Sequence, residues 1–189
     1  DKPIRVWGSA DPEATVQVCL ADLNGTTKAD QHGTWSLELE ALPANAEGTI
    51  LSVTSNSETI EYQDVIIGDV WILGGQSNME DELENVYHGD VEVASANHPN
   101  IRLMTIPQEA SPQPLSNFAR INEYNSWTGR NEQKGGWFRC TPETVHRFSA
   151  IGYIFGRRLH LVSGIPIGEI SPDDGQSSEI VKVASGAAE

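Results

Sequence analysis

The chain has 189 residues and a mass of 20.6 kDa, enough for one large domain or two small ones. It carries 12 basic and 27 acidic residues, a net charge of −15, which is the opposite of the basic footprint that nucleic-acid phosphates attract. Its apolar runs are far shorter than the roughly 18 residues of a membrane-spanning helix. We therefore expect neither a nucleic-acid partner nor a membrane span.

The first 68 residues have the pattern of short strands separated by turns. Apolar and polar residues alternate in 15–20 and in 35–40, so every second side chain points to one face of a strand. Asn24 and Gly25 predict a hairpin turn, because both residues tolerate a positive φ. The spacing predicts an antiparallel β-sandwich. The expected strands are 4–10, 15–20, 34–42, 49–55 and 59–67.

The pattern changes at residue 69. Residues 70–73 form a continuous apolar run, which is typical of a strand covered on both faces in a parallel sheet. A glycine-containing segment, 74–79, follows the run. Residues 80–86 are then rich in helix formers, with acidic residues in the first turn, where the helix dipole favours them. The sequence predicts a strand, a glycine turn and a helix.

The next two segments differ in character. Residues 97–107 predict a second core strand, whereas 108–135 is a polar stretch rich in Asn, Gln, Ser, Pro and Gly. Because long connections of this kind often carry function, we expect 108–135 to be a substrate-facing loop.

A long helix is expected near the end of the chain. Thr141 and Pro142 have the pattern of a helix N-cap followed by proline at the first helical position, and Gly164 is a suitable residue to end the helix. Strand character returns in 165–171, so strands and helices alternate and an α/β fold is expected for 69–189. The apolar residues expected to face the core are Phe148, Ile151, Phe155, Leu159 and Val162.

Ser77 is the most informative candidate for chemistry. A serine at the carboxyl end of a parallel strand, next to a glycine turn, exposes its hydroxyl where open α/β sheets bind ligands. The backbone N–H groups that follow would point the same way, so this segment offers a nucleophile and part of an oxyanion hole. The local pattern alone also suits a plain helix N-cap. Acyl transfer is the functional interpretation.

Several blocks of the sequence resemble the sialate O-acetylesterase family, SGNH-type hydrolases that act on acetylated carbohydrates. The blocks in the second part are 68–80 (GDVWILGGQSNME), 137–160 and 163–171 (SGIPIGEIS), while 1–18 and 32–42 resemble the leading β-sandwich module of the family. The resemblance implies a β-sandwich at 1–68, followed at 69–189 by the N-terminal part of an α/β three-layer SGNH-hydrolase-like domain with a parallel sheet.

The same resemblance implies the chemistry. Ser77 would be the nucleophile that attacks an acetyl carbonyl, and water would hydrolyse the resulting acyl-enzyme without a metal or an organic cofactor. The oxyanion hole would use Ser77 and Gly175. The substrate would be an O-acetylated sugar or glycan, and the protein would work in a secreted, periplasmic or lysosome-like compartment.

Two departures from the family pattern matter. The family follows its strand with a Ser-x-Trp-Gly-Gly-Thr block, whereas residues 171–178 read SPDDGQSS, so Gly175 would replace the family glycine and the tryptophan is absent. The family also ends in an Asp-x-x-His block that this chain lacks. We therefore expect a second segment or a second chain to complete the catalytic domain.

None of the five histidines is predicted to be the base. His32, His88, His98 and His160 have the pattern of surface or boundary residues, and Glu143-x-x-His146 straddles a helix start. No His or Cys spacing supports zinc, and Cys19 and Cys140 have neither CxxC spacing nor a disulfide framework. The alternatives to an esterase are a non-catalytic carbohydrate-binding or adaptor protein, or an inactive fragment.

Overall fold

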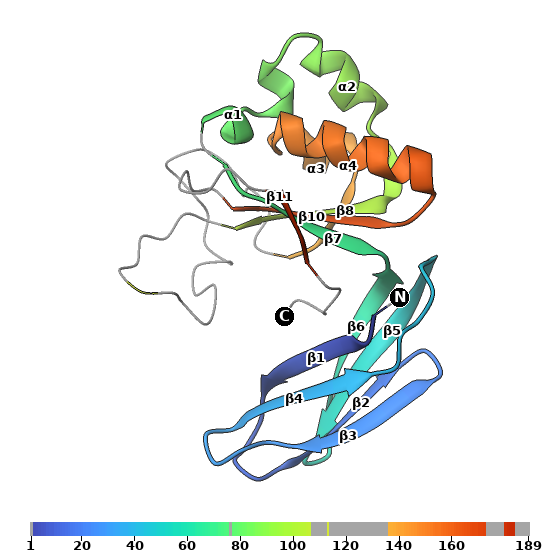
Figure 1. Cartoon of the computed structure of the whole chain (residues 1–189), viewed down its shortest axis with the longest axis vertical. Helices are drawn as coiled ribbons and strands as arrows, with labels where there is room; N and C mark the ends of the chain where they lie inside the picture. The colour runs from blue at the N-terminus through green and yellow to red at the C-terminus, as the bar shows by residue number, and fades with distance from the viewer. Residues whose placement is uncertain (1, 76, 107–112, 114–135, 173–179, 184–189) are drawn as a thin grey trace. The chain divides into compact units, whose positions relative to one another are not determined.

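A computed structural model describes residues 2–75, 77–106, 113, 136–172 and 180–183. The chain divides into two compact units, which can be followed by their colours in Figure 1. Unit 1 comprises Asp1–Gly68 with Ala184–Glu189, and unit 2 comprises Asp69–Val183. Each unit has its own cluster of buried apolar side chains, so each is described by itself.

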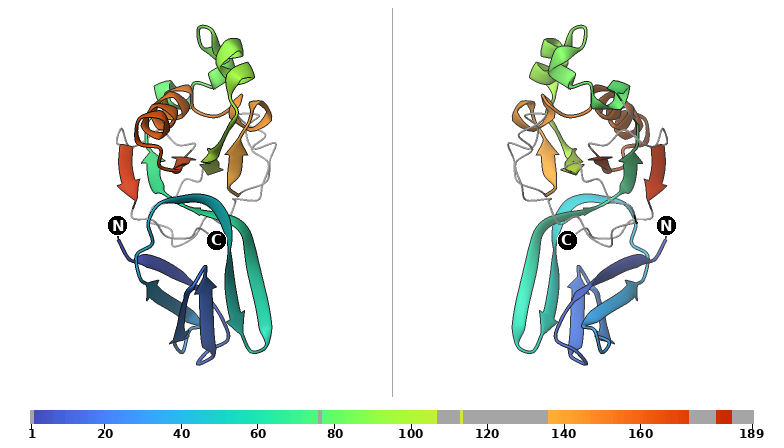
Figure 2. Two further views of the ribbon diagram at one scale, coloured as in Figure 1. Left: turned by 90° about the vertical axis from the view of Figure 1, so that its right-hand side faces the viewer. Right: turned by 90° about the vertical axis from the view of Figure 1, so that its left-hand side faces the viewer.

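Unit 1 consists of two antiparallel sheets (Figure 2). One sheet pairs β1 (Ile4–Ser9) with β4 (Thr34–Leu39). The other has the order β3-β2-β5-β6, formed by β2 (Thr15–Leu20), β3 (Leu23–Lys28), β5 (Asn45–Ser55) and β6 (Glu58–Ile67). Side chains from both sheets meet in a single buried cluster.

The predicted alternation in 15–20 is confirmed. In β2, Val16, Val18 and Leu20 are buried, whereas Thr15 and Gln17 are exposed. Because successive side chains of a strand point to opposite faces, the buried set lies on the one face that contributes to the cluster.

The predicted turn at Asn24 and Gly25 is wrong. Ala21 and Asp22 connect the paired ends of β2 and β3 instead, and Ala21 takes the positive φ, 50°. Asn24 and Gly25 lie inside β3. A Cβ atom on Gly25 would lie 2.7 Å from Leu37 Cδ2, so this glycine leaves room for packing.

Unit 2 is built on a five-stranded mixed sheet with the order β11-β7-β10-β8-β9. The three central strands are parallel, and the two outer strands run antiparallel to them. The predicted strands at 70–73, 97–107 and 165–171 are thereby confirmed, whereas β9 and β11 were not predicted. The strands are β7 (Asp69–Leu73), β8 (His98–Ile106), β9 (Phe138–Cys140), β10 (Ile167–Pro172) and β11 (Ile180–Val183).

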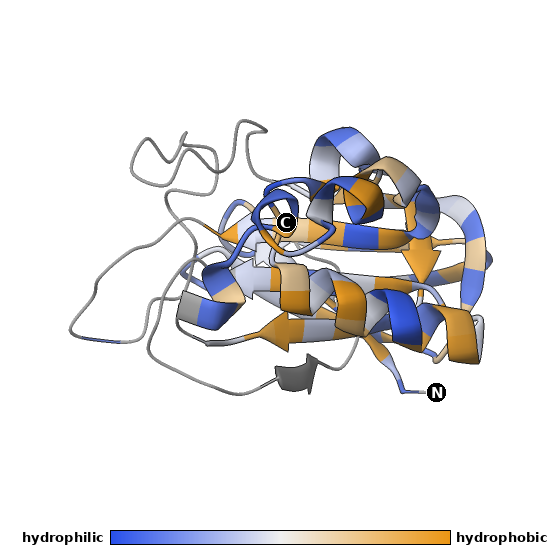
Figure 3. Ribbon diagram, turned by 90° about the horizontal axis from the view of Figure 1, so that it is seen from above, coloured by the Kyte–Doolittle hydropathy of each residue, from blue (hydrophilic) through white to orange (hydrophobic). Residues whose placement is uncertain are grey.

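The described helices of unit 2 lie on one side of this sheet in Figure 1, and the hydropathy colouring of Figure 3 shows apolar and polar residues mixed along them. A three-layer domain needs helices on the second side as well, so that arrangement stays a prediction. The helices are α1 (Ser77–Glu80), the 3-10 helix η1 (Leu83–Asn85), α2 (Gly89–Ser95), α3 (Pro142–Val145) and α4 (Ala150–Ser163).

The predicted helix over 80–86 is wrong, because α1 ends at Glu80. The backbone that follows pairs with a distant segment instead: Ala150 N–H donates to the Asp81 carbonyl at 2.9 Å, and Leu83 N–H donates to the Phe148 carbonyl at 3.0 Å. These non-local bonds satisfy the polar groups that a continuing helix would have used, so tertiary structure outweighs local helix propensity.

The single helix expected from Thr141 to Gly164 is divided in two. Thr141 and Pro142 do begin a helix, and Thr141 forms a capping box with Thr144, but this helix, α3, ends at Val145. A second N-cap, Ser149, begins α4, where its hydroxyl accepts a bond from Gly152 N–H at 3.2 Å. The predicted end at Gly164 is confirmed by its φ of 69°.

The predicted core face of this helix is confirmed for Phe148 and Phe155, which lie in or pack against the buried cluster, and is wrong for Ile151 and Val162. Ile151 is 45% exposed and Val162 is 90% exposed, while Phe148 is buried but precedes α4. The face of α4 toward the sheet also includes small residues, since a Cβ atom on Gly152 would lie 2.4 Å from Leu73 Cδ1. The buried residues of α4 are Ala150, Gly152, Tyr153 and Gly156.

Candidate active site

Ser77 begins α1 shortly after β7 ends at Leu73. Gly74 and Gly75, which follow the strand, are both buried. Because β7 is parallel to β10, this turn lies at the edge where parallel strands have their carboxyl ends, and open α/β folds bind ligands at that edge. The structure therefore agrees with the predicted order of strand, glycine turn and helix, although this helix begins at Ser77 and ends at Glu80 rather than covering 80–86.

The neighbouring strands bring further polar residues to this edge. Ile170 of β10 pairs with Ile72, so Ser171 lies next to the end of β7, and on its other side Ser171 pairs with Thr105 of β8. Ser171 is buried. The second predicted member of the oxyanion hole, Gly175, lies outside the described residues, as does all of the predicted loop 108–135 except for residue 113.

The short helix α1 is fixed to the start of α4. A Cβ atom on Gly75 would lie 2.8 Å from Met79 Cβ, so the turn closes tightly over this methionine. The hydroxyl of Ser149 donates to Met79 Sδ at 3.2 Å, and the same hydroxyl caps α4. One side chain thus joins the helix that Ser77 begins to the longest helix of the unit. No pattern in the sequence predicts this contact.

Two histidines lie at the opposite edge of the sheet. His98 is the first residue of β8, and His160 Nδ1 lies 2.8 Å from the carbonyl of Ile165, just before β10 begins. Parallel strands have their amino ends at one edge, and a strand rises roughly 3.3 Å per residue. The length of the sheet therefore separates both histidines from Ser77. Burial, followed by the charges of Arg157 and His160, lowers the pKa of His98.

The other histidines occupy unrelated places. His32 lies in unit 1, and His88 is exposed with its ring centroid 3.9 Å from that of Tyr87. His146 follows α3 and is half-buried. Glu143 is exposed, and its pKa is lowered mainly by a hydrogen bond with the side chain of Thr141. None of these positions identifies a general base.

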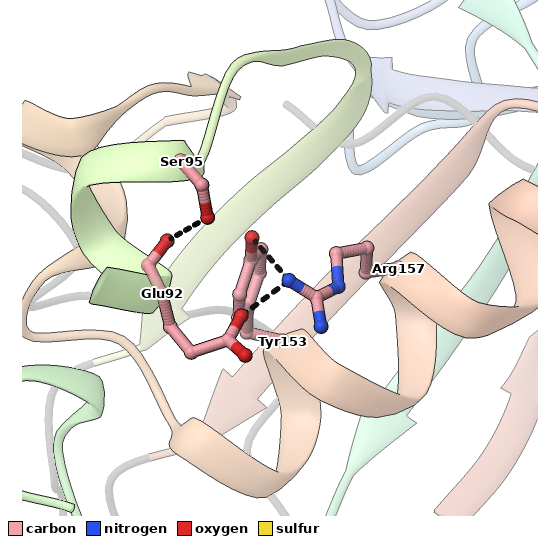
Figure 4. A network of polar contacts seen from close by, with 4 residues as sticks. All are labelled: Glu92, Ser95, Tyr153 and Arg157. Atoms are coloured by element: carbon pink, nitrogen blue, oxygen red, sulfur yellow. Dashed lines mark hydrogen bonds and ion pairs between the residues drawn. The ribbon is translucent and has the colours of Figure 1, made fainter. Parts of the chain in front are cut away.

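A polar network ties α2 to α4 (Figure 4). Arg157 Nη1 donates to a carboxylate oxygen of Glu92 and lies 3.4 Å from the Tyr153 hydroxyl. The guanidinium carbon also lies 5.1 Å from the centroid of the Tyr153 ring. This network joins the side chains of two helices of unit 2.

The described residues contain neither a candidate metal cluster nor a candidate membrane-spanning helix. Among the described residues, no group of three or more His, Cys, Asp or Glu side chains is arranged to hold a metal ion. Within the same part of the chain, no helix has the length and apolar character needed to cross a membrane.

Known proteins provide a further comparison. No family model matches the sequence. The chain is 24% identical over 176 residues to "Sialate O-acetylesterase" of Pongo abelii, Homo sapiens and Mus musculus, and these alignments cover 88% of the chain. The crystal structure of "a novel carbohydrate acetylesterase" from Xanthomonas citri matches with a TM-score of 0.79 and 33% identity over 90% of the chain.

Over most of its length, the chain is thus similar to sialate O-acetylesterases and to a solved carbohydrate acetylesterase. The resemblance noted in the sequence blocks is thereby confirmed. The chain spans 32% of the length of the human sialate O-acetylesterase and 36% of the solved acetylesterase chain. The activity that these names state therefore belongs to proteins that are longer than this chain.

Proposed function

We propose that this chain is part of a carbohydrate esterase that removes O-acetyl groups from sugars, with Ser77 as its nucleophile. The position of Ser77 carries the proposal, because it begins α1 at the carboxyl-end edge of the parallel strands. The names of the similar proteins supply the substrate class, since they are a sialate O-acetylesterase and a carbohydrate acetylesterase.

The proposed reaction has two steps. The Ser77 hydroxyl attacks the acetyl carbonyl, the sugar oxygen leaves with a proton, and an acetyl-enzyme forms. Water then attacks the acetyl-enzyme, releasing acetate and restoring the serine. The backbone amides of Ser77 and Gly175 are proposed to stabilise the oxyanion in both steps.

A proton acceptor must complete this site, because a serine hydroxyl with an ordinary pKa is a weak nucleophile. His98 and His160 lie at the opposite edge of the sheet. We propose that a histidine and an aspartate from a second segment or a second chain act as the base and its orienting group. Unit 1 is proposed to be a β-sandwich module that accompanies this domain.

The test is acetate release from p-nitrophenyl acetate and from an O-acetylated sugar. The chain is assayed alone and with the remaining part of the catalytic domain supplied in trans. The Ser77→Ala variant should lose at least about 10³-fold in rate, whereas Ser163→Ala, at the exposed end of α4, should keep full activity. Equal rates for wild type and Ser77→Ala would remove Ser77 from the mechanism.

A carbohydrate-binding or adaptor protein is the second candidate. The observation that favours it is the distance of His98 and His160 from the Ser77 edge. In that case calorimetry would detect sugar binding without turnover, and a serine-directed fluorophosphonate would leave the protein unlabelled. Stoichiometric labelling of Ser77 would instead favour the esterase.

A further inference from the structure

Glu169 is a carboxylic acid in the centre of an apolar core. It lies in the middle of β10, where it pairs with Trp71 of β7 and Leu103 of β8. Its exposed fraction is 0%. Trp71 packs against Phe155 of α4 with ring centroids 5.2 Å apart, so this face of the sheet is the one that α4 covers.

The carboxyl group of Glu169 has no hydrogen-bond partner among the described residues. It occupies the space opposite Gly156 of α4, where a Cβ atom would lie 2.3 Å from one carboxyl oxygen and 2.8 Å from the other. The glycine thus makes room for the acid. A buried charge without a partner costs far more free energy than a buried neutral group.

Among the described residues, no cation is hydrogen-bonded to the carboxyl group of Glu169. On α4, Arg157 is bonded to Glu92 and Arg158 is exposed. The paired positions of β7 and β8 are occupied by Trp71 and Leu103. The titratable or charged groups on the packed elements are Tyr153, Arg157, Arg158 and His160 on α4, Cys140 and Arg139 on β9, His98 and Arg102 on β8, and Asp69 on β7.

The pKa values of Cys140 and Glu169 are both shifted by their apolar surroundings. Burial, reinforced by the charge of Glu169, raises the pKa of the Cys140 thiol to about 12. Burial also raises the pKa of Glu169 well above its usual range, and the nearby backbone of Gly156 lowers it only in part. Both shifts favour the neutral form of the group.

We propose that Glu169 is a pH-sensitive switch beneath α4, held as a neutral acid in the folded unit and loosening α4 from the sheet when it loses its proton. On ionisation the proton passes to water, and the carboxylate must gain solvent by separating β10 from Gly156. Because Ser149 joins the start of α4 to Met79 of α1, the loosening extends to the turn that contains Ser77. The proposal is independent of the esterase function.

The sign of the effect follows from proton linkage. The folded unit keeps the proton of Glu169 at pH values where the unfolded chain has lost it, so the stabilising contribution is complete below about pH 4.5. It is lost as pH rises through the folded-state pKa. In that window, the folded-to-unfolded ratio of wild type falls about tenfold per pH unit relative to a variant without this acid.

The test is hydrogen exchange of the full chain, read by mass spectrometry on peptides from α4 and β10 between pH 4 and 9. Wild type, Glu169→Gln and Glu169→Met are compared at each pH, so the intrinsic exchange rates cancel. Peptides from unit 1 serve as an internal reference. The matched control is Glu143→Gln, which makes the same chemical change at an exposed glutamate of unit 2.

The expected result is a protection ratio of wild type to Glu169→Gln that falls about tenfold per pH unit above pH 4.5 and then levels off. For the Glu143→Gln control, the protection ratio of wild type to variant should not change with pH or should rise with pH, because the folded-state pKa of Glu143 is lowered. A ratio independent of pH for both Glu169 variants would overturn the proposal. If Glu169→Gln fails to fold, the slope of Glu169→Met decides.

Discussion

The two units bury different kinds of residue. In unit 1 the buried cluster is apolar and joins two sheets, and the acid with a shifted pKa, Asp30, lies exposed in a turn. Unit 2 buries a whole carboxyl group, Glu169, and packs glycines of α4 against its sheet. Unit 1 therefore follows the usual division of apolar and polar residues, whereas unit 2 departs from it under a single helix.

The two units also differ in the glycines that allow close packing. Unit 1 obtains close contact between sheets from Gly25, which leaves room for Leu37. Unit 2 obtains close contact between helix and sheet from Gly152 and Gly156. In unit 2 one of these close contacts is filled by an ionisable group, so its packing, unlike that of unit 1, should depend on pH.

The largest effect is expected from Trp35, a buried residue of β4 whose ring lies 3.0 Å from where a Gly8 Cβ would be. Trp35→Ala should destabilise unit 1 by about 3–5 kcal/mol, because it leaves a large cavity. Trp35→Phe is the matched control. It keeps most of the bulk and removes an indole N–H that has no hydrogen-bond partner among the described residues, so its loss should be much smaller.

Hydrogen exchange read separately on peptides of the two units measures this effect. Since the buried clusters are separate, unit 2 should keep its protection in Trp35→Ala. An equal loss of protection in both units would mean that the chain unfolds as one body, which would remove the basis for comparing them.

A smaller loss is expected in unit 2 from Gly152→Ala. Alanine is favoured over glycine in a helix by roughly 1 kcal/mol, but its Cβ would lie 2.4 Å from Leu73 Cδ1. Overpacking of this kind costs about 1–3 kcal/mol, so a net loss is expected in chemical denaturation. The control is Arg158→Ala at an exposed position of the same helix. A stabilised Gly152→Ala protein would show that α4 moves away at little cost.

The sequence predicted unit 1 better than unit 2, for a physical reason. Alternation in 15–20 is a local signal that sets which side chains are buried, and β2 follows it. The turn was misplaced because Gly25 was interpreted by its φ freedom, although it serves a contact with Leu37, 12 residues farther along the chain. A glycine shows that space is needed but not which atom fills it.

In unit 2 the sequence predicted the position of Ser77 but not its support. An apolar run followed by Gly74, Gly75 and a serine is a local pattern, and β7 and α1 have it. The contact of Met79 with Ser149 joins residues 70 positions apart, so no local pattern reveals it. Glu169 lies within the predicted strand 165–171. An acid between apolar residues of a core strand indicates a buried ionisable group, but the strand pattern alone gives it no role.

The contact between α2 and α4 should contribute less than either packing change. The side chains of Arg157 and Glu92 are 21% and 30% exposed, and partly exposed ion pairs contribute about 0–1 kcal/mol. A double-mutant cycle with Arg157→Met and Glu92→Gln should give a coupling free energy in that range, decreasing as salt is raised. A coupling that salt does not change would assign the contact to hydrogen bonding rather than charge.

The smallest effect concerns Asp30, the counterpart in unit 1 of Glu169. Its Oδ1 accepts bonds from His32 N–H at 2.8 Å and Thr34 N–H at 2.9 Å, and these bonds, the one from Thr34 first, lower its pKa. The folded-state pKa is thus below the unfolded value of 3.8, so the stabilisation is present above that pH and is lost as pH falls through the folded-state pKa. Asp30→Asn should therefore lose stability relative to wild type only above about pH 4, as measured by hydrogen exchange in unit 1 peptides.

The pH dependence of Asp30 is opposite in sign to that expected for Glu169. Backbone N–H groups stabilise Asp30 as an anion, whereas the buried carboxyl group of Glu169 has no hydrogen-bond partner among the described residues. Equal slopes for the two acids would contradict the contrast drawn between the units.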